Sequence, residues 1–144
     1  MKNYTSAVDS SKTIARIEAI LAKTGAQNII KNYQDGLLVN VTFTLKVNGK
    51  VIAILLPANI DAAFEVMRAK VKRPHQGTLD RLREQAARTA WKLQQEWLEI
   101  QLSFIEMKQV EPLQAFMGYI YNGKTTLYQV MKSSGFKLLT EGTK

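Results

Sequence analysis

The chain has 144 residues, of which 46% are hydrophobic and 22% charged, and its 20 Lys and Arg against 12 Asp and Glu give a formal net charge of +8. This composition predicts one globular domain over residues 1–144 and excludes an intrinsically disordered chain. Disulfides and thiolate sites are excluded because there is no cysteine. With His75 as the single histidine, we expect no metal site.

Nothing in the sequence predicts a membrane partner. No run approaches the roughly 18 apolar residues that a transmembrane helix requires. Met1 to Val8 also lacks the charged and then apolar plan of an export signal. We therefore expect a cytoplasmic protein.

The N-terminal segment predicts a short strand and then a helix. The strand is Asn3 to Val8, and the helix begins near Lys12 after three residues that offer N-cap oxygens, Asp9, Ser10 and Ser11. Apolar residues recur at helical spacing before a left-handed end at Gly25: Ile14, Ile17, Ile20 and Leu21.

A three-stranded antiparallel meander is predicted between Asn28 and Leu56. Residues alternate between apolar and polar from Val39 to Val47, which is typical of a half-buried strand. Asp35-Gly36 and Asn48-Gly49 are typical of two-residue type I′ turns. The second turn places six apolar side chains on one buried face in three pairs: Leu45 with Ile52, Phe43 with Ile54 and Val41 with Leu56.

Two further helices are predicted after Pro57. Asn59 or Asp61 caps the first, which runs to about Val71, and the loop from Arg73 to Gly77 follows. The second runs from Thr78 to Lys108 and has two apolar rows: Leu82, Ala86, Ala90, Leu93, Trp97, Ile100 and Phe104, and Ala87, Trp91, Leu98, Leu102 and Ile105. Its polar side is narrow: Arg81, Glu84, Arg88, Lys92, Gln95, Glu99 and Glu106.

Such an apolar helix must be covered. It packs on the sheet, or it also forms a homo-oligomer interface through residues 78–108. The predicted fold class is therefore α+β. Its order is an N-terminal strand and helix, the meander, a long apolar helix and a short C-terminal helical segment.

GYIYNGKT, residues 118–125, matches the phosphate-loop pattern G-x-x-x-x-G-K-[ST]. A working phosphate loop needs a buried strand before it, a helix after it and further strands, one with an acidic residue for magnesium. The residues after Thr125 are too few for such a sheet, and the variable positions are bulky. We instead expect a turn at Asn122-Gly123 and a short helix that starts at Thr125 or Thr126.

The other signals for catalysis are equally weak. There is no Gly-x-Ser-x-Gly elbow, and Glu96, Glu99 and Glu106 are spaced as solvent-facing helix residues usually are. We expect a non-enzymatic protein without catalytic residues or a cofactor. An enzyme with an unrecognised site stays open as a third alternative.

The positive charge is concentrated in one stretch. Residues 68–92 contain eight Lys and Arg against Asp80 and Glu84, which is +6 of the +8. Clustered cations attract phosphates and release counterions on contact. The alternative is a solvated helix face without a partner.

These cations predict a site for nucleic acid or a nucleotide. Arg81, Arg88 and Lys92, with Gln95, recur at seven, four and three residues and would line one stripe of a helix. A ridge just before them adds Arg68, Lys70, Lys72 and Arg73. Bases could stack on Trp91, Tyr119 or Tyr121, although Trp91 and Trp97 fall on apolar rows and fit core packing better.

Several segments together resemble a group of small proteins of bacteria, prophages and other mobile elements that have no established activity. The segments are Tyr4-Thr5 with Lys12-Thr13, Leu56 to Ile60, Glu84 to Trp91, Trp97 to Ile105 and Gly123 to Tyr128. The resemblance covers most of the chain. It implies a setting of nucleic-acid handling or interference with host defence.

Two functions of different class follow. In the first, the protein is a phage or mobile-element accessory that binds an anionic partner, nucleic acid above all, through a basic helical surface. In the second, it is a small oligomeric anti-defence protein that inhibits a host immune protein or sequesters a nucleotide signal. The identity of the ligand and the oligomeric state stay open at this point.

Overall fold

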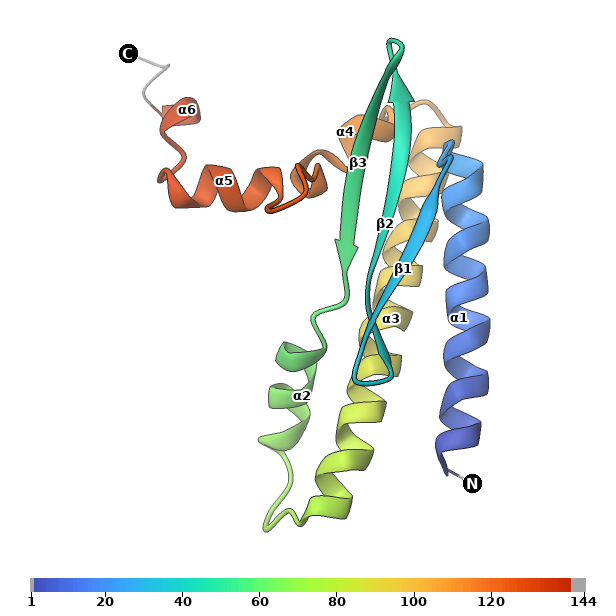
Figure 1. Cartoon of the computed structure of the whole chain (residues 1–144), viewed down its shortest axis with the longest axis vertical. Helices are drawn as coiled ribbons and strands as arrows, with labels where there is room; N and C mark the ends of the chain where they lie inside the picture. Colours follow the sequence, from blue (N-terminus) through green and yellow to red (C-terminus); the bar gives the residue numbers. More distant parts are fainter. Residues whose placement is uncertain (1, 141–144) are drawn as a thin grey trace.

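The computed structural model describes residues 2–140, with side chains described from Ser11 onwards. Figure 1 shows a three-stranded sheet against two long helices, with a helical hairpin below it and a C-terminal arm beside it. The elements in chain order are α1 (Lys2–Thr24), β1 (Ile29–Gln34), β2 (Leu37–Val47), β3 (Lys50–Pro57), α2 (Ile60–Arg68), α3 (Gln76–Glu106), α4 (Pro112–Ala115), the 3-10 helix η1 (Met117–Tyr119), α5 (Leu127–Ser133) and α6 (Lys137–Thr140).

The predicted N-terminal strand is wrong, because Asn3 to Val8 belongs to α1. Asp9, Ser10 and Ser11 lie inside this helix instead of capping it. No Gly or Pro interrupts the sequence from Lys2 to Thr24, and a helix that has nucleated extends cooperatively through such a segment. The predicted end is right, since Gly25 has φ 103°, in the left-handed region that glycine adopts without strain.

The meander is confirmed, including its register. The sheet order is β1-β2-β3 with both pairings antiparallel, and Leu45, Phe43 and Val41 lie opposite Ile52, Ile54 and Leu56 as predicted. Both two-residue turns have positive φ at both positions, as type I′ turns require. Five of the six paired side chains are buried, and Ile52 is half-buried.

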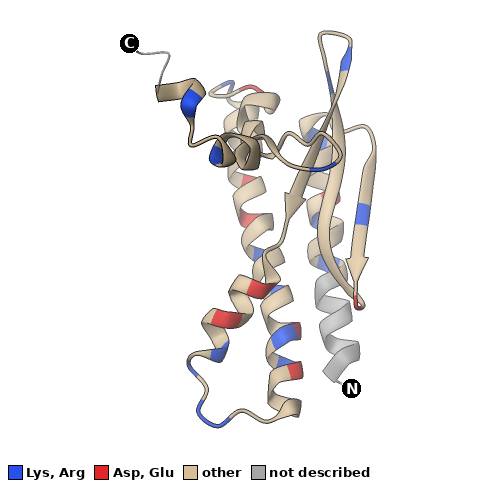
Figure 2. Cartoon of the chain, turned by 60° about the vertical axis from the view of Figure 1, so that its left-hand side comes forward, with Lys and Arg blue, Asp and Glu red and all other residues tan. Residues whose placement is uncertain are grey.

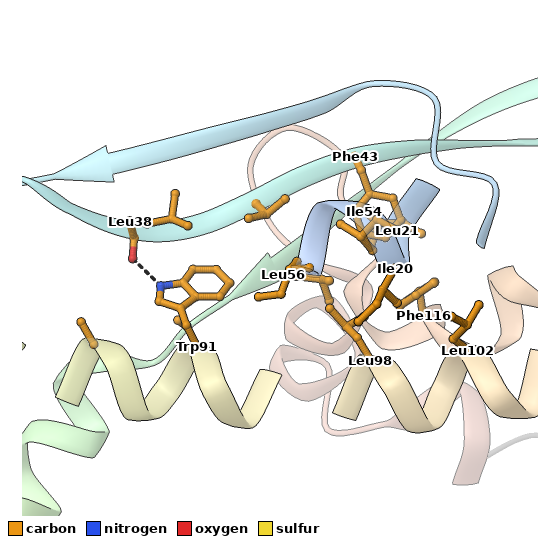
Figure 3. Close-up of a cluster of buried hydrophobic side chains, with 14 of the residues drawn as sticks. Ile20, Leu21, Leu38, Phe43, Ile54, Leu56, Trp91, Leu98, Leu102 and Phe116 are labelled. Atoms are coloured by element: carbon orange, nitrogen blue, oxygen red, sulfur yellow. Dashed lines mark hydrogen bonds between the residues drawn. The ribbon is translucent and has the colours of Figure 1, made fainter. Parts of the chain in front are cut away.

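The inner face of the sheet packs against α1 and α3, which lie side by side. Phe43 and Phe116 meet edge to face, with ring centroids 5.2 Å apart, so the segment after α4 closes the top of this core. Figure 3 shows these buried side chains converging between sheet and helices. The largest fully buried members are Phe43, Phe116, Ile17, Ile20, Leu21, Ile54, Leu56, Leu98 and Val41.

Trp91 fixes the position of α3 along its axis relative to the sheet. Its indole Nε1 donates a hydrogen bond of 2.8 Å to the carbonyl oxygen of Leu38, the second residue of β2, and its side chain is 3% exposed (Figure 3). The fifteen residues of α3 before Trp91 rise about 22 Å at 1.5 Å per residue. The N-terminal half of α3 therefore extends below the sheet, as Figure 1 shows.

α2 covers this extension of α3 and forms a hairpin with it. Asn59 caps α2, since its Oδ1 accepts a hydrogen bond of 3.1 Å from the Ala62 N–H. His75 caps α3 through Nδ1, which accepts from the Thr78 N–H, so α3 begins two residues before the predicted Thr78. α2 ends at Arg68, three residues before the predicted Val71.

α3 is long, as predicted, but only part of its surface is apolar and buried. Its buried residues are Ala86, Ala87, Trp91, Gln95, Leu98 and Leu102. Gln95, which was assigned to the polar side, is buried and donates to Glu99. Leu93, Ile100 and Phe104, which were assigned to an apolar row, are about half exposed or more.

Trp91→Phe is expected to destabilise the protein by about 1–3 kcal/mol, because the Leu38 carbonyl is left without its donor at a buried site. Urea denaturation monitored by circular dichroism measures the change. Lys92→Gln, at the neighbouring exposed position, should stay within about 0.5 kcal/mol of the wild type. Equal losses in the two variants would contradict the assigned role of Trp91.

Candidate anion-binding surface

Four cations gather at the lower end of the α2–α3 hairpin, and we call them the basic tip: Arg68, Lys70, Lys72 and Arg73. Arg68 is the last residue of α2, and the other three lie in the loop before α3. All four side chains are exposed. Figure 2 shows Lys and Arg concentrated along this loop, with the acidic residues of α2 higher on the helix.

No ion pair within the described part of the chain involves the basic tip. Of the acids closest to it, Asp61 binds Arg83, and Asp80 accepts a hydrogen bond of 2.9 Å from the Gln76 side chain. Glu65, about one turn before Arg68 on α2, is exposed and forms no ion pair with the tip. Repulsion among four close cations raises their energy in the free protein, and an anion relieves it. The basic tip is therefore electrostatically suited to an anionic ligand.

Arg73 has φ 51°, in the left-handed region that non-glycine residues adopt at some cost. The other non-glycine residues with positive φ in the described chain lie in tight turns or just after helices: Asp35, Asn48, Lys108 and Phe136. Pro74 and the His75 cap follow Arg73 and fix the entry into α3. The geometry holds the last cation of the tip at the turn into α3.

Arg83 braces the hairpin that presents this tip. Its Nη2 donates to Asp61 at 2.7 Å, and its guanidinium lies 5.7 Å from the ring centroid of Phe64, both on α2. A guanidinium over an aromatic face adds to an exposed ion pair, which alone contributes little. Sequence reasoning counted Arg83 among the cations and missed this role, because its partners are about twenty residues away along the chain.

The α3 stripe, Arg81, Arg88 and Lys92, is separate from the basic tip. Arg83 faces α2, and Arg81 lies two residues earlier, about 200° around the helix. Arg88 and Lys92 share the side of Arg81, so the stripe points away from α2. The sequence predicts one continuous surface made of the basic tip and the α3 stripe. In the structure these cations form two separate groups.

The α3 stripe is also less available than expected. Arg88 is half-buried and already engaged in an interaction, whereas Arg81 and Lys92 are exposed. At the upper end of the stripe, Arg16 of α1 donates to Glu99 at 2.9 Å. The bond to Arg16, with help from Gln95 and the charge of Lys92, lowers the pKa of Glu99 below its usual value. This carboxylate offsets part of the positive charge.

None of the three aromatic candidates is beside the basic tip. Trp91 is in the core, as the core-packing alternative held, and its N–H is occupied. Tyr119 is half-buried against Trp97, with ring centroids 5.9 Å apart, and the Tyr121 hydroxyl donates to the Gly123 carbonyl. Both tyrosines lie where the C-terminal segment crosses β3, far from the hairpin loop (Figure 1).

The phosphate-loop match at residues 118–125 forms a turn, as expected. The Asn122 side chain accepts hydrogen bonds of 2.9 Å from the backbone N–H groups of Lys124 and Thr125. The Thr126 N–H donates to Gln129, in a capping box that starts the seven-residue α5. The backbone N–H groups of Lys124, Thr125 and Thr126 are therefore already bonded to side chains of the same segment.

One small cavity lies between the sheet and α2 and has a volume of about 180 Å³. Its lining includes two carboxylates, Asp35 and Asp61, and the already paired Arg83. Pockets that enclose small-molecule ligands are usually about 300–1,000 Å³. The cavity is too small and too acidic for a nucleotide.

Comparison of the chain with protein-family models, curated proteins and solved structures gave no match. The described residues contain no cluster of three His, Cys, Asp or Glu side chains that could hold a metal ion. None of the helices in the described part of the chain combines the length and the apolar character needed to cross a bilayer.

The lowered pKa of Glu99 predicts a pH dependence of stability. A carboxyl group with a lowered pKa in the folded state stabilises the protein above its unfolded pKa of about 4.3 and loses this effect as pH falls through the folded value. Glu99→Gln should therefore lose less stability on acidification than the wild type in urea denaturation.

Arg16→Gln is the matched control. It removes the hydrogen bond from Arg16, the largest cause of the lowered Glu99 pKa, and keeps the Glu99 carboxyl group. NMR titration should then find the pKa of Glu99 closer to its ordinary value. An unchanged Glu99 titration in Arg16→Gln would contradict the assigned cause.

Proposed function

We propose that the protein is a non-enzymatic nucleic-acid-binding accessory that holds phosphates through the basic tip, with Arg81 of the α3 stripe at the same end of the hairpin. The observation behind the proposal is four exposed cations, Arg68 at the end of α2 and three in the loop after it, that form no ion pair with the described residues and project below the sheet. Long Lys and Arg side chains on such a loop can contact successive phosphates of one backbone.

The shape of the basic tip favours a polymer over a small anion. Small ligands are bound where polar groups converge on a concave site. The cations here project from the end of α2 and the loop after it, and the cavity between the sheet and α2 has Asp35 and Asp61 in its lining. A nucleic-acid backbone presents phosphates at regular intervals to such a surface, so its binding does not require a pocket.

The proposed binding has little sequence preference. Phosphate contacts from Lys and Arg fix position and carry no sequence information. The aromatic candidates for base contact are in the core or at the other end of the molecule. Nucleic-acid binding without sequence specificity fits the phage or mobile-element setting that the resemblance implies.

The second candidate is a small oligomeric anti-defence protein that inhibits a host immune protein or sequesters a nucleotide signal. It draws support from the exposed apolar residues on α3, namely Leu93, Ile100 and Phe104. Apolar groups of this kind mark protein contacts. Saturable binding of a mononucleotide, with no affinity for DNA or RNA, would select this candidate.

Replacing the basic tip by Gln at all four positions should weaken binding to duplex DNA and flatten its salt dependence. About four phosphate contacts predict that wild-type affinity falls roughly 100-fold between about 50 and 200 mM salt, with a slope of log K against log salt near −3.6. Because the variant loses these four contacts, the magnitude of its slope should fall by about 3.6. Fluorescence anisotropy over a salt series measures both.

The matched control has the same change in charge at exposed lysines far from the hairpin loop: Lys23→Gln, Lys46→Gln, Lys50→Gln and Lys124→Gln. It should keep most of the wild-type slope. Equal slopes in the two variants would mean that binding follows net charge alone, and the assignment to the basic tip would fail. A third variant, Arg81→Gln with Lys92→Gln, measures the share of the α3 stripe.

A further inference from the structure

Two groups of exposed large apolar side chains lie on α3 and on the C-terminal arm. The first, which we call the α3 strip, consists of Leu93, Ile100, Phe104 and Met107, with exposed fractions from 49% to 70%. Steps of seven, four and three residues bring these side chains within about 60° of one another around a helix. Trp97 belongs to the same row but is covered by Phe116 and Tyr119.

The second surface is the C-terminal arm, residues 122–140. The chain is held to β3 just before the arm, where the Tyr121 N–H donates to the Ala53 carbonyl at 2.9 Å. Beyond this point α5 and α6 project away from the sheet, as Figure 1 shows. The arm exposes four large apolar side chains with exposed fractions from 43% to 76%: Tyr128, Val130, Leu138 and Leu139. The Tyr128 ring also contacts Phe136 of the same arm, with ring centroids 6.2 Å apart.

We propose that the protein forms a dimer in which the C-terminal arm of each subunit packs along the α3 strip of the other. An arm that extends into solvent gains nothing from its apolar side chains unless a second surface covers them. The α3 strip is such a surface, and every copy of the chain has both. Two arm-to-strip contacts related by a twofold axis close the assembly at a dimer.

The charges of the two surfaces are complementary. The arm contains Lys124, Lys132 and Lys137 and no acidic residue, which gives +3. Residues 93–111 contain four Glu against Lys108, but around α3 only Glu96 flanks the strip, whereas Glu99 and Glu106 lie roughly 100° or more from its centre. Glu99 is paired with Arg16, while the other three are exposed: Glu96, Glu106 and Glu111. Opposite charges favour a contact between the arm of one subunit and the α3 strip of the other over a contact between the two α3 strips.

The apolar area reaches that of a standard interface. Full burial of a large apolar side chain removes roughly 60–120 Å² from water. Tyr128 and Val130 are two residues apart on α5, so one face of the arm presents at most one of them. Seven side chains per subunit, somewhat more than half exposed on average, amount to roughly 250–500 Å². Since about 60% of an interface is apolar, this area corresponds to roughly 400–800 Å² per subunit, whose upper end reaches the approximately 800 Å² of a standard interface.

Sedimentation velocity of the full chain tests the proposal, with a dimer of 16.3 kDa subunits as the expected wild-type species. The arm variant is Leu138→Glu with Leu139→Glu, and the strip variant is Ile100→Glu with Phe104→Glu. Each alone should be monomeric. All four side chains are largely exposed, so circular dichroism should show unchanged folding.

Mixing the two variants separates this arrangement from other dimers. The strip variant has an intact arm and the arm variant an intact strip, so their mixture retains one contact and should form a heterodimer by native mass spectrometry. If the strips of two copies packed on each other instead, the arm variant would remain a dimer. That result, or a monomeric wild type at every concentration, would overturn the proposal.

Val66→Glu is the matched control, since Val66 is 61% exposed on α2, away from both surfaces. It should leave the dimer intact. The proposal is independent of nucleic-acid binding, because the basic tip belongs to neither surface. A monomeric protein could still bind nucleic acid through the basic tip, and a dimeric protein could lack this binding.

Discussion

The position of α3 against the sheet determines what the molecule presents to solvent, and the bond from Trp91 to the Leu38 carbonyl fixes that position. α3 is longer than the sheet that packs against it, so the N-terminal half of α3 extends beyond the end of the sheet. α2 fills that space, and Arg83 braces it through Asp61 and Phe64. The loop between the two helices is thereby held below the sheet with its cations in water. A one-turn slide of α3 would break the bond and move the loop by about 5.4 Å.

The sequence determines the sheet well, because its signals are local. The Asn48-Gly49 turn and a period of two fix the register of the β2–β3 pair, and Asp35-Gly36 forms the turn from β1 to β2, as the structure confirms. The strand at Asn3 to Val8 was wrong because six residues without a turn signal cannot outweigh a helix that continues through them. The sides of α3 were partly misassigned because they depend on partners elsewhere in the chain. Gln95 is buried and Leu93 is exposed, and which side of α3 is covered depends on the packing of α1 and α2, which periodicity does not report.

For the candidate site too, the sequence predicts features that depend on neighbouring residues and does not predict those that depend on contacts between distant parts of the chain. Clustering of cations in residues 68–92 is a property of the sequence, and the exposure of the basic tip agrees with it. Whether those cations form one surface depends on how α2 and α3 face each other, and Arg83 shows that Arg81 points the other way. Among the aromatic candidates, only Trp91 is next to the basic stretch in the sequence, beside Lys92. Trp91 is in the core, and Tyr119 and Tyr121 lie at the opposite end. The proposed function therefore depends on charge at the tip and makes no use of base stacking.

The most direct measurement is a map of backbone amide shifts by ¹⁵N NMR as a short DNA duplex is added. The account predicts shifts concentrated in residues 68–81, with smaller ones along the exposed side of α3, and their loss on addition of salt. Shifts confined to the C-terminal arm or the outer face of the sheet, or no shifts at low salt, would contradict it.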